Sequence, residues 1–474
     1  MFLWDFLLYL TGWPLAFLLF CGGLYFTIRT GLPQLRLFRE SIRVVAEKPA
    51  TDGAISSFGA LMISTASRVG TGNIIGVSSA LCMGGPGAVF WMWVTAVLGG
   101  ASAFVESTLA QVYKKRDPNG GSYGGPAYYI EAALHSRLLA VIFSIALIGC
   151  YAVGYNMLCA YNLQSAFSGF KFYNFRLELG PIAITTPAII GFLIAAAFLY
   201  CILGGGQRVV KVTGTLVPIM GVLYVLLALI AMLLNIKNIP AMFAMIFSDA
   251  FNFKAIFGGF MGSCLMYGFK RGLYSNEAGM GSAPNAAAAA DVSHPVKQGL
   301  VQMLSVFIDT LLLCTATAFM CLSSGVLPRP DDTFAGAPYV QAALSATFGA
   351  AGPVFIVVAL LLFAFTTLLG NFYYVENCFA YILKQVPSKK FMTIARVIGA
   401  ILIFIGAILK FGFAWDLADV FQCVLAIINI PVCVILGRVA YNALDDYVAQ
   451  RDMGKNPTYK AHEFGVTVPT DFWN

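Results

Sequence analysis

The sequence predicts an all-α, polytopic membrane protein with about eleven transmembrane helices, on the evidence of its composition and its apolar runs. Apolar residues make up 59% of the 474 residues, charged residues make up 11%, and the mean hydropathy is +0.80. A soluble domain would carry roughly twice that charged fraction. A helix needs only about 20 apolar residues to cross a bilayer, and such runs follow one another along nearly the whole chain. No separate soluble domain is expected.

The apolar runs are separated by short polar loops, which set the limits of the individual spans. The predicted spans cover residues 4–28, 54–82, 86–113, 138–167, 183–203, 209–235, 253–291, 297–323, 353–384, 392–411 and 415–443. The residues after 443 are polar and contain no further long apolar run.

The distribution of positive charge predicts the orientation of the spans. Most of the 29 lysines and arginines lie in alternate loops or in the C-terminal tail, as in the stretches 29–48, 114–116 and 384–390. Short loops rich in Lys and Arg stay in the cytoplasm, so we expect the N-terminus outside, the C-terminus inside and a location in a bacterial inner membrane. Lys270 and Arg271 are expected to snorkel to the cytoplasmic side. Because topology accounts for the basic loops, no nucleic-acid partner is expected.

Two of the predicted spans are interrupted by polar, glycine-rich stretches. The second contains Arg68 and then Gly70, Thr71, Gly72 and Asn73. The seventh, residues 253–291, would reach nearly twice the hydrocarbon thickness as one helix. It must therefore break, and it is most polar between residues 275 and 282. Unwound backbone is tolerated at membrane depth only where it is buried in protein or lines a cavity.

The positions of these two spans indicate an internal repeat. Each interrupted span opens a group of five, and an odd number of spans gives the two groups opposite orientations in the membrane. We expect an extra N-terminal helix with a basic loop in residues 1–53 and a cytoplasmic tail in residues 444–474. Between them lie a first repeat (54–235) and a second, inverted repeat (236–443).

A broken helix provides chemistry for a zwitterion. Free N–H groups open its second half and suit a carboxylate, whereas free carbonyls close its first half and suit Na⁺ or an ammonium group. In the second span the donors would be Thr71, Gly72 and Asn73, and the carbonyls would lie between Ala66 and Val69. The alternative is a packing kink between helices. Two breaks at matching places in two repeats favour a binding site.

Charged and hydroxyl side chains inside the spans are further candidates. Arg68 and Glu277 lie at the two breaks and are the best candidates for gating or coupling, paired with each other or with unwound carbonyls. Glu106, Asp309 and Glu376 are as typical of structural ion-pair members as of gate elements, and Glu106 is also a candidate for gating or coupling. The adjacent Thr366 and Thr367 could complete an oxygen shell for Na⁺, but alone they are more typical of threonines bonded to their own helix.

Three stretches of the sequence resemble the alanine or glycine:cation symporter family. They are GTGNIIGV at 70–77, GGPGAVFWMWVTAVLGG at 84–100 and KRGLYSNEAGMGSAPNAAAAA at 270–290. The resemblance covers nearly the whole chain and implies a LeuT-like fold of 5+5 inverted repeats, with Na⁺-driven, or sometimes H⁺-driven, uptake of a small neutral amino acid.

The resemblance also implies the positions of the two sites. The carbonyls of Ala66 and Val69 and the hydroxyls of Thr366 and Thr367 would bind Na⁺. The amino acid would be bound by residues of both breaks and of the fourth span: Gly70, Thr71, Gly72, Asn73, Asn156, Met157, Cys159, Ser275, Asn276, Gly279 and Met280.

The fourth span departs from the family pattern Gly-Asn-Met-x-Gln-x-Asn. Asn156 and Met157 match, but Cys159 stands in the place of the Gln and Tyr161 in the place of the Asn. The family Gln is thought to line the substrate pocket. Its loss removes an amide, and leaves open which neutral amino acid is bound.

Other function classes are less well supported. A channel would need continuous polar pore-lining faces or a ring of carbonyls, and the sequence shows neither. A non-transporting amino-acid sensor on the same fold is compatible with the altered fourth span. An enzyme is not expected, because the sequence contains no phosphate-binding loop, nucleophile elbow or metal motif. No cofactor other than the coupling ion is expected, and the oligomeric state stays open.

Overall fold

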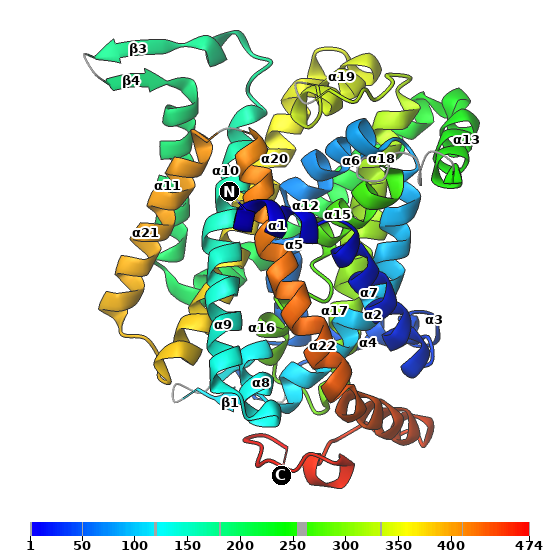
Figure 1. Cartoon of the computed structure of the whole chain (residues 1–474), viewed down its shortest axis with the longest axis vertical. Coiled ribbons are helices and arrows are strands. Elements are labelled where there is room, and N and C mark those ends of the chain that lie inside the picture. The colour runs from blue at the N-terminus through cyan, green and yellow to red at the C-terminus, as the bar shows by residue number, and fades with distance from the viewer. Residues whose placement is uncertain are drawn as a thin grey trace.

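The computed structural model describes residues 2–49, 51–117, 121–179, 182–253, 263–331, 334–409 and 411–473. The chain forms a bundle of helices that run mostly between two end faces, with the C-terminus on one of them (Figure 1). Eight helices of the described residues are long and apolar enough to cross a membrane. They coincide with eight of the predicted spans. The other three predicted places hold α11, which is shorter, and the two interrupted segments, of which residues 254–262 lie outside the described ranges.

The helices of the first half include two π-helical segments, η1 and η2. In order they are α1 (Phe2–Leu10), α2 (Trp13–Arg29), α3 (Pro33–Arg36), α4 (Phe38–Val45), α5 (Ser57–Arg68), η1 (Gly72–Gly76), α6 (Val77–Gly84), α7 (Ala88–Val112), α8 (Pro126–Leu134), α9 (Arg137–Ile148), η2 (Gly149–Tyr155), α10 (Asn156–Ser165), α11 (Thr186–Ile202) and α12 (Gly205–Leu234).

The second half continues in the same way, with η5 as its π-helical segment. Its helices are α13 (Ile239–Ala250), α15 (Cys264–Asn276), α16 (Ala283–Ala288), α17 (Pro295–Val306), η5 (Phe307–Cys314), α18 (Thr315–Ser323), α19 (Ala337–Phe348), α20 (Ala351–Leu383), α21 (Lys389–Ala407) and α22 (Phe411–Asp452). Short 3₁₀ turns are η3 (Lys171–Asn174), η4 (Ile236–Asn238) and η6 (Ala461–Phe464).

Two antiparallel ribbons lie outside the long helices. One joins β1 (Lys115–Arg116) to β2 (Ser122–Tyr123), and the other joins β3 (Arg176–Leu179) to β4 (Ile182–Thr185). The second ribbon takes up the start of the predicted span 183–203. The helix begins only at Thr186, because Pro187 fits the first turn of a helix.

Outward-facing apolar side chains identify the surface that meets lipid. On α12, Leu223, Leu229 and Leu233 are at least half exposed, and Phe192 of α11 and Ile398 of α21 are exposed as well. A water-soluble surface would not present so many large apolar side chains together. The α11–α21 pair, side by side at one edge in Figure 1, is thus a lipid-facing element.

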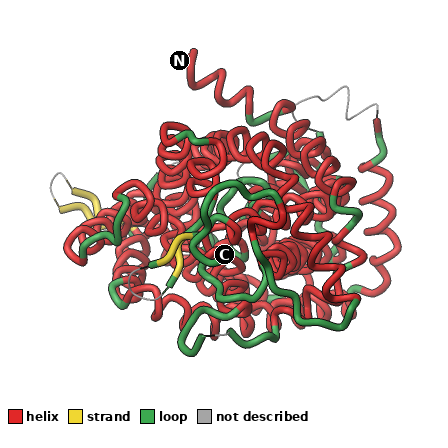
Figure 2. Tube along the Cα trace, turned by 90° about the horizontal axis from the view of Figure 1, so that it is seen from below, coloured by secondary structure: helices red, strands yellow, loops and turns green. Residues whose placement is uncertain are grey.

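The polar tail does not hang free. α22 continues past the predicted limit at 443 to Asp452, and the chain then folds back across the end of the bundle (Figure 2). We call residues 455–473 the C-terminal strap. The indole Nε1 of Trp473 donates to the carbonyl of Gln111 at 2.7 Å, and Asp471 pairs with Lys115 at 2.9 Å. The strap therefore covers the end of α7.

Candidate functional site

The first break follows α5. The helix ends at Arg68, and Val69 takes a non-helical conformation with ψ 87°. The Asn73 side chain then folds back, and its Oδ1 accepts a hydrogen bond from the N–H of Gly70 at 2.8 Å. A side-chain amide thus replaces a helical bond that the break removes. The predicted interruption of the second span is confirmed.

The second break lies between α15 and α16. Glu277, Gly279 and Gly281 all have positive φ, at 55°, 85° and 77°. Glycine adopts this region without steric cost. Glu106 of α7 holds the unwound segment, because its carboxylate accepts from the N–H groups of Gly279 at 3.3 Å and Gly281 at 3.0 Å. The Asn429 amide of α22 donates to the same carboxylate at 2.7 Å. Glu106 is therefore a clamp on unwound backbone.

The two breaks lie against each other. The Ser67 hydroxyl, just before the first break, lies 3.0 Å from Oε1 of Glu277 in the second. A Cβ added to Gly72 would lie 2.9 Å from the Tyr274 ring and 3.5 Å from the Cα of Ser275. Both unwound stretches are buried. They therefore form one site and not two separate kinks.

Asp309 joins the two interrupted spans. Its carboxylate accepts from the Asn73 amide at 2.7 Å, from the Ser275 hydroxyl at 2.8 Å and from the neighbouring Thr310 hydroxyl at 2.7 Å. Asp309 lies in the π-helical η5, and π-bulges are frequent at functional sites. Of the two roles expected for Asp309, the ion pair is not found in the described part of the chain, and its hydrogen bonds to both interrupted spans were not predicted.

Arg68 and Glu277 do not pair with each other. The guanidinium Nη1 of Arg68 donates to the carbonyl and to the side-chain Oε1 of Gln302, both at 3.3 Å. Glu277 instead accepts from the hydroxyls of Ser67 and Ser282. The expectation that Arg68 pairs with Glu277 or with an unwound carbonyl is therefore wrong, because the carbonyl that Arg68 meets belongs to Gln302 inside the helix α17.

Comparison with known proteins gives the same assignment as the motifs. The model of the sodium:alanine symporter family matches residues 4–461. The chain is 42% identical to the amino-acid carrier protein AlsT of Bacillus subtilis, over 97% of this chain and 95% of AlsT. It is 36% identical to the sodium/alanine symporter AgcS of Methanococcus maripaludis, over 90% of this chain and 92% of AgcS.

The chain belongs to the sodium:alanine symporter family.

The fold of the chain is similar to that of a solved structure of much lower sequence identity. The crystal structure of MhsT in complex with L-phenylalanine aligns with a TM-score of 0.59, covering 84% of this chain and 93% of that one at 16% identity. At this identity the likeness concerns the fold alone. It bears out the predicted LeuT-like, all-helical membrane architecture, and the family membership makes this symporter a transporter and not an enzyme.

The two threonines of the symporter's α20 point in different directions. Thr367 donates to the carbonyl of Val69 at 3.3 Å, at the end of the first half-helix. The Thr366 hydroxyl lies 3.0 Å from the carbonyls of its own helix at Leu362 and Phe363. α20 reaches Ala66 through Gly370, where an added Cβ would lie 3.2 Å from the Ala66 carbonyl carbon. Of the pair, only Thr367 faces the break in this structure.

The predicted residues of α10 also divide. Asn156 accepts from Asn371 at 2.8 Å, and Cys159 lies 3.5 Å from the carbonyl of Ala364, so both face α20. The backbone of Met157 packs against Gly406 of α21. The amide that reaches the first break is that of Asn162, which donates to Thr71 at 3.1 Å. Asn162 follows the position where the family pattern places its Asn.

The other predicted residues of the second break face different neighbours. The Asn276 side chain accepts from the N–H of Ala278 at 3.0 Å and so shapes the turn itself. The Tyr155 hydroxyl lies 3.6 Å from the sulfur of Met280. Met280 therefore lies beside an aromatic cluster next to the first break.

The aromatic cluster consists of Tyr155, Tyr274 and Trp415, and it covers the breaks on the side away from the strap. The rings of Tyr155 and Tyr274 lie 4.8 Å apart, and Trp415 lies 5.0 Å from Tyr274. Above them Arg271 pairs with Asp419 at 3.2 Å and lies 4.0 Å from the Trp415 ring centroid. Arg271 is thus held by a buried carboxylate, and the expected snorkelling of Lys270 and Arg271 to the cytoplasmic side stays a prediction.

A backbone hydrogen bond covers the breaks on the strap side. The N–H of Asp291, just after α16, donates to the carbonyl of Ile55 at 2.9 Å, just before α5. This bond joins the outer ends of the two interrupted segments beneath the breaks. The strap lies next to it, since the hydroxyl of Ser293 donates to the carbonyl of Pro457 at 2.8 Å. The residues of both breaks are buried between these contacts in this structure of the symporter.

Proposed function

We propose that this protein is a symporter that imports a small neutral amino acid, alanine or glycine, together with Na⁺ by alternating access. The observation that carries the proposal is the single buried cluster in which Asp309 holds Asn73 of one break and Ser275 of the other. A cluster shared by two interrupted helices can respond to ligand in both at once. Relatives support the ion, since AgcS is described as a sodium/alanine symporter.

The first break would supply N–H groups for the carboxylate of an amino acid and carbonyl groups for a cation. The substrate carboxylate would bind at the N–H groups of Thr71 and Gly72, where the second half-helix begins. Na⁺ would bind at the carbonyls of Ala66 and Val69 with the Thr367 hydroxyl. The Tyr274 ring packs against Gly72, since a Cβ added there would lie 2.9 Å from it, and this close packing favours a substrate with a short side chain. Asp309 would position Asn73 and Ser275 around this ligand.

The direction of transport follows from the proposed orientation. The strap face, with its basic loops, would be cytoplasmic and the N-terminus outside, in a bacterial inner membrane. The repeats 54–235 and 236–443 would move against each other about the breaks. Arg271–Asp419 would then be the outer closure, and the Ile55–Asp291 contact with the strap the inner closure.

Two alternatives to this proposal differ from it in the substrate or in the coupling ion. A Bacillus subtilis relative that is 41% identical over 94% of this chain is described as a probable sodium/glutamine symporter, GlnT. A Bacillus sp. relative, 34% identical over 91% of the chain, is described as a sodium/proton-dependent alanine carrier. Cys159, in place of an amide, favours a substrate without a long polar side chain, and so favours alanine or glycine over glutamine.

A ligand-stabilisation screen tests the proposal. The purified protein is heated with each neutral amino acid in Na⁺ buffer and in buffer where choline replaces Na⁺. A ligand at 100 times its dissociation constant adds about 2.7 kcal/mol to the folded state. We expect alanine or glycine to raise the melting temperature only with Na⁺. Stabilisation by glutamine alone would reassign the substrate, and stabilisation that ignores Na⁺ would contradict sodium coupling.

A further inference from the structure

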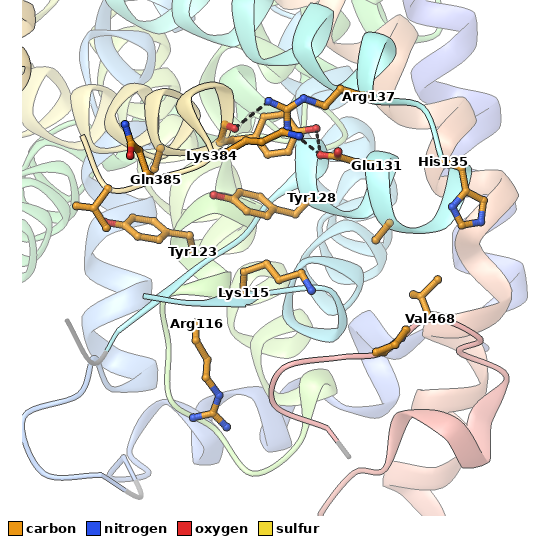
Figure 3. A pocket seen from close by; sticks show the side chains of 15 residues that line it. Lys115, Arg116, Tyr123, Tyr128, Glu131, His135, Arg137, Lys384, Gln385 and Val468 are labelled. Atoms are coloured by element: carbon orange, nitrogen blue, oxygen red, sulfur yellow. Dashed lines mark hydrogen bonds and ion pairs between the residues drawn. The ribbon is translucent and has the colours of Figure 1, made fainter. Parts of the chain in front are cut away.

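A hollow lies on the strap face of the molecule, away from the breaks. Its volume is about 950 Å³, within the range of ligand-binding pockets, and its walls come from the β1–β2 ribbon, α8, the start of α9, the end of α20 and the strap. Figure 3 shows it from close by. We call it the ribbon pocket. None of its lining residues belongs to either break, so the proposed transport site does not account for it.

The ribbon pocket is lined by positive charge. Lys115 and Arg116 of β1, Arg137 of α9 and Lys384 after α20 line it, against one lining carboxylate, Glu131. That carboxylate is already bound, by Arg137 at 3.0 Å and by the Tyr381 hydroxyl. Charge compensation inside the pocket is therefore incomplete.

The basic side chains of the pocket differ in whether a carboxylate already pairs with them. Asp471 of the strap binds Lys115 and also accepts from the backbone N–H of Arg116 at 3.0 Å, and the Arg116 side chain points away from the Tyr128 group in Figure 3. Within the described ranges, no carboxylate oxygen lies within 4.0 Å of the Lys384 ammonium group. Lys384 is thus the cation of this pocket with no ion-pair partner.

Aromatic side chains complete the lining. Tyr128 packs edge-on against Tyr381 at 5.0 Å, and Arg137 lies 4.6 Å from the centroid of the same Tyr381 ring. The Tyr123 and Tyr128 side chains line the pocket beside these groups. Phenol hydroxyls donate hydrogen bonds to phosphate oxygens, and guanidinium and ammonium groups bind phosphate strongly.

Exposed apolar side chains lie directly beside the residues that line this pocket. Leu138, next to Arg137, is 73% exposed, and Leu383 and Val386, on either side of Lys384, are 39% and 37% exposed. Apolar side chains that face outward at the ends of α9 and α20 are placed to contact acyl chains. The basic residues beside them then stand at headgroup level, where basic pockets between transmembrane helices bind anionic lipids.

We propose that the ribbon pocket binds a phosphate-bearing ligand, with the headgroup of an anionic phospholipid as its source. The phosphate lies between Lys384 and Arg137, and the acyl chains follow the outer face of α9. Val468 and Pro469 of the strap line the same pocket, so the bound headgroup also contacts the strap. The proposal does not depend on the transported substrate or on sodium coupling.

The test compares two neutral lysine variants in two membranes. Lys384→Gln removes the unpaired cation of the pocket, and Lys389→Gln removes an equally charged, exposed lysine at the start of α21 that does not line it. Each protein is placed in nanodiscs of phosphatidylcholine alone or with phosphatidylglycerol, and lipid retention and melting temperature are measured. In detergent, inorganic phosphate and ATP are added as soluble phosphate sources.

We expect phosphatidylglycerol to stabilise the wild type and Lys389→Gln, and to be bound about fivefold more weakly by Lys384→Gln. Lys384→Arg should restore binding. Stabilisation by phosphate or ATP in detergent that is lost in Lys384→Gln would support the pocket and reassign its ligand to a soluble phosphate. An equal response of the two neutral variants, or no response to any phosphate source, would overturn the proposal. A failed transport assay would leave this result unchanged.

Discussion

Gly70 shows how tightly the first break is packed against α20. A Cβ added there would lie 2.2 Å from the Thr367 hydroxyl oxygen and 3.1 Å from its Cβ. Real side chains do not approach this closely, and the Thr367 rotamer is held by its bond to Val69. The absence of a side chain at Gly70 is therefore part of the geometry of the proposed ion site.

We expect Gly70→Ala to destabilise the protein by about 1–3 kcal/mol through overpacking and to abolish Na⁺-dependent ligand stabilisation. The control is Gly221→Ala in α12, where nothing lies within 4 Å of the added Cβ. That change should be neutral, or stabilising by about 0.5–1 kcal/mol, because alanine favours the helix. Thermal unfolding with and without Na⁺ measures both. Equal behaviour of the two variants would contradict the packing argument.

The neighbouring threonines provide a second matched pair. Thr367→Ala removes the hydroxyl that faces the Val69 carbonyl, and Thr366→Ala removes one that bonds its own helix. We expect Thr367→Ala to raise the Na⁺ concentration for half-maximal stabilisation about tenfold, in line with one lost contact to a charged group. Thr366→Ala should change it little. A larger effect of Thr366→Ala would show that Na⁺ binding turns its hydroxyl toward the break.

For single residues, the sequence predicted the positions of the breaks better than it predicted the side chains that contact them. Gly70 to Asn73 were predicted because polar, glycine-rich residues stand out inside an apolar span. The partners of Asp309 and the place of Asn162 beside the first break were not predicted, because these contacts depend on the direction in which each side chain leaves its helix. Each lies in or after a π-helical segment, which shifts the facing of later side chains relative to an α-helix. The sequence contains no signal for that shift beyond the polar residues themselves.

Among the elements, the C-terminal strap departs most from its predicted character. The sequence predicted a polar cytoplasmic tail over residues 444–474, and no packing partner for it. In the structure its few aromatic residues carry the packing. Tyr459 lies 5.0 Å from His294 and 5.9 Å from Trp473, and Lys297 donates to Asn456 at 2.7 Å. These partners come from distant parts of the chain, so composition alone could not reveal them.

The strap should loosen on acidification through His294. Its Nδ1 accepts from the N–H of Val296, and its Nε2 lies 3.2 Å from Asp446, between the rings of Tyr447 and Tyr459. Burial lowers the pKa of His294 below its ordinary 6.5, with Lys297 adding to the effect and Asp446 opposing it. The neutral form is thus favoured in the packed state, and a second proton would break the bond from Val296.

The sign follows from this lowered pKa. The packed state binds fewer protons than the opened state once the pH falls below the ordinary pKa, so strap stability is present above about pH 6.5 and is lost as pH falls further. We expect protease cleavage of the strap to be faster at about pH 5.5 than at about pH 7.5. His294→Asn can still accept from Val296 but does not titrate, so its cleavage should lose this pH dependence. An unchanged pH dependence in His294→Asn would rule out His294 as the cause.

For the whole molecule, the long spans and the fold class could be predicted because hydropathy and glycine-rich breaks are local signals. The closed state of the site could not, because it depends on contacts between distant segments. Arg271 meets Asp419 on one side, and Ile55 meets Asp291 on the other.

The most direct test of the central claim is uptake of labelled alanine and glycine by the purified protein in liposomes. An inward Na⁺ gradient, an inward H⁺ gradient and no gradient are compared. We predict accumulation above the external concentration with the Na⁺ gradient alone, and its loss when the gradient is collapsed. Uptake that proceeds equally under all three conditions, or Na⁺-dependent binding without any uptake, would contradict the claim that these two broken helices couple Na⁺ to amino-acid transport.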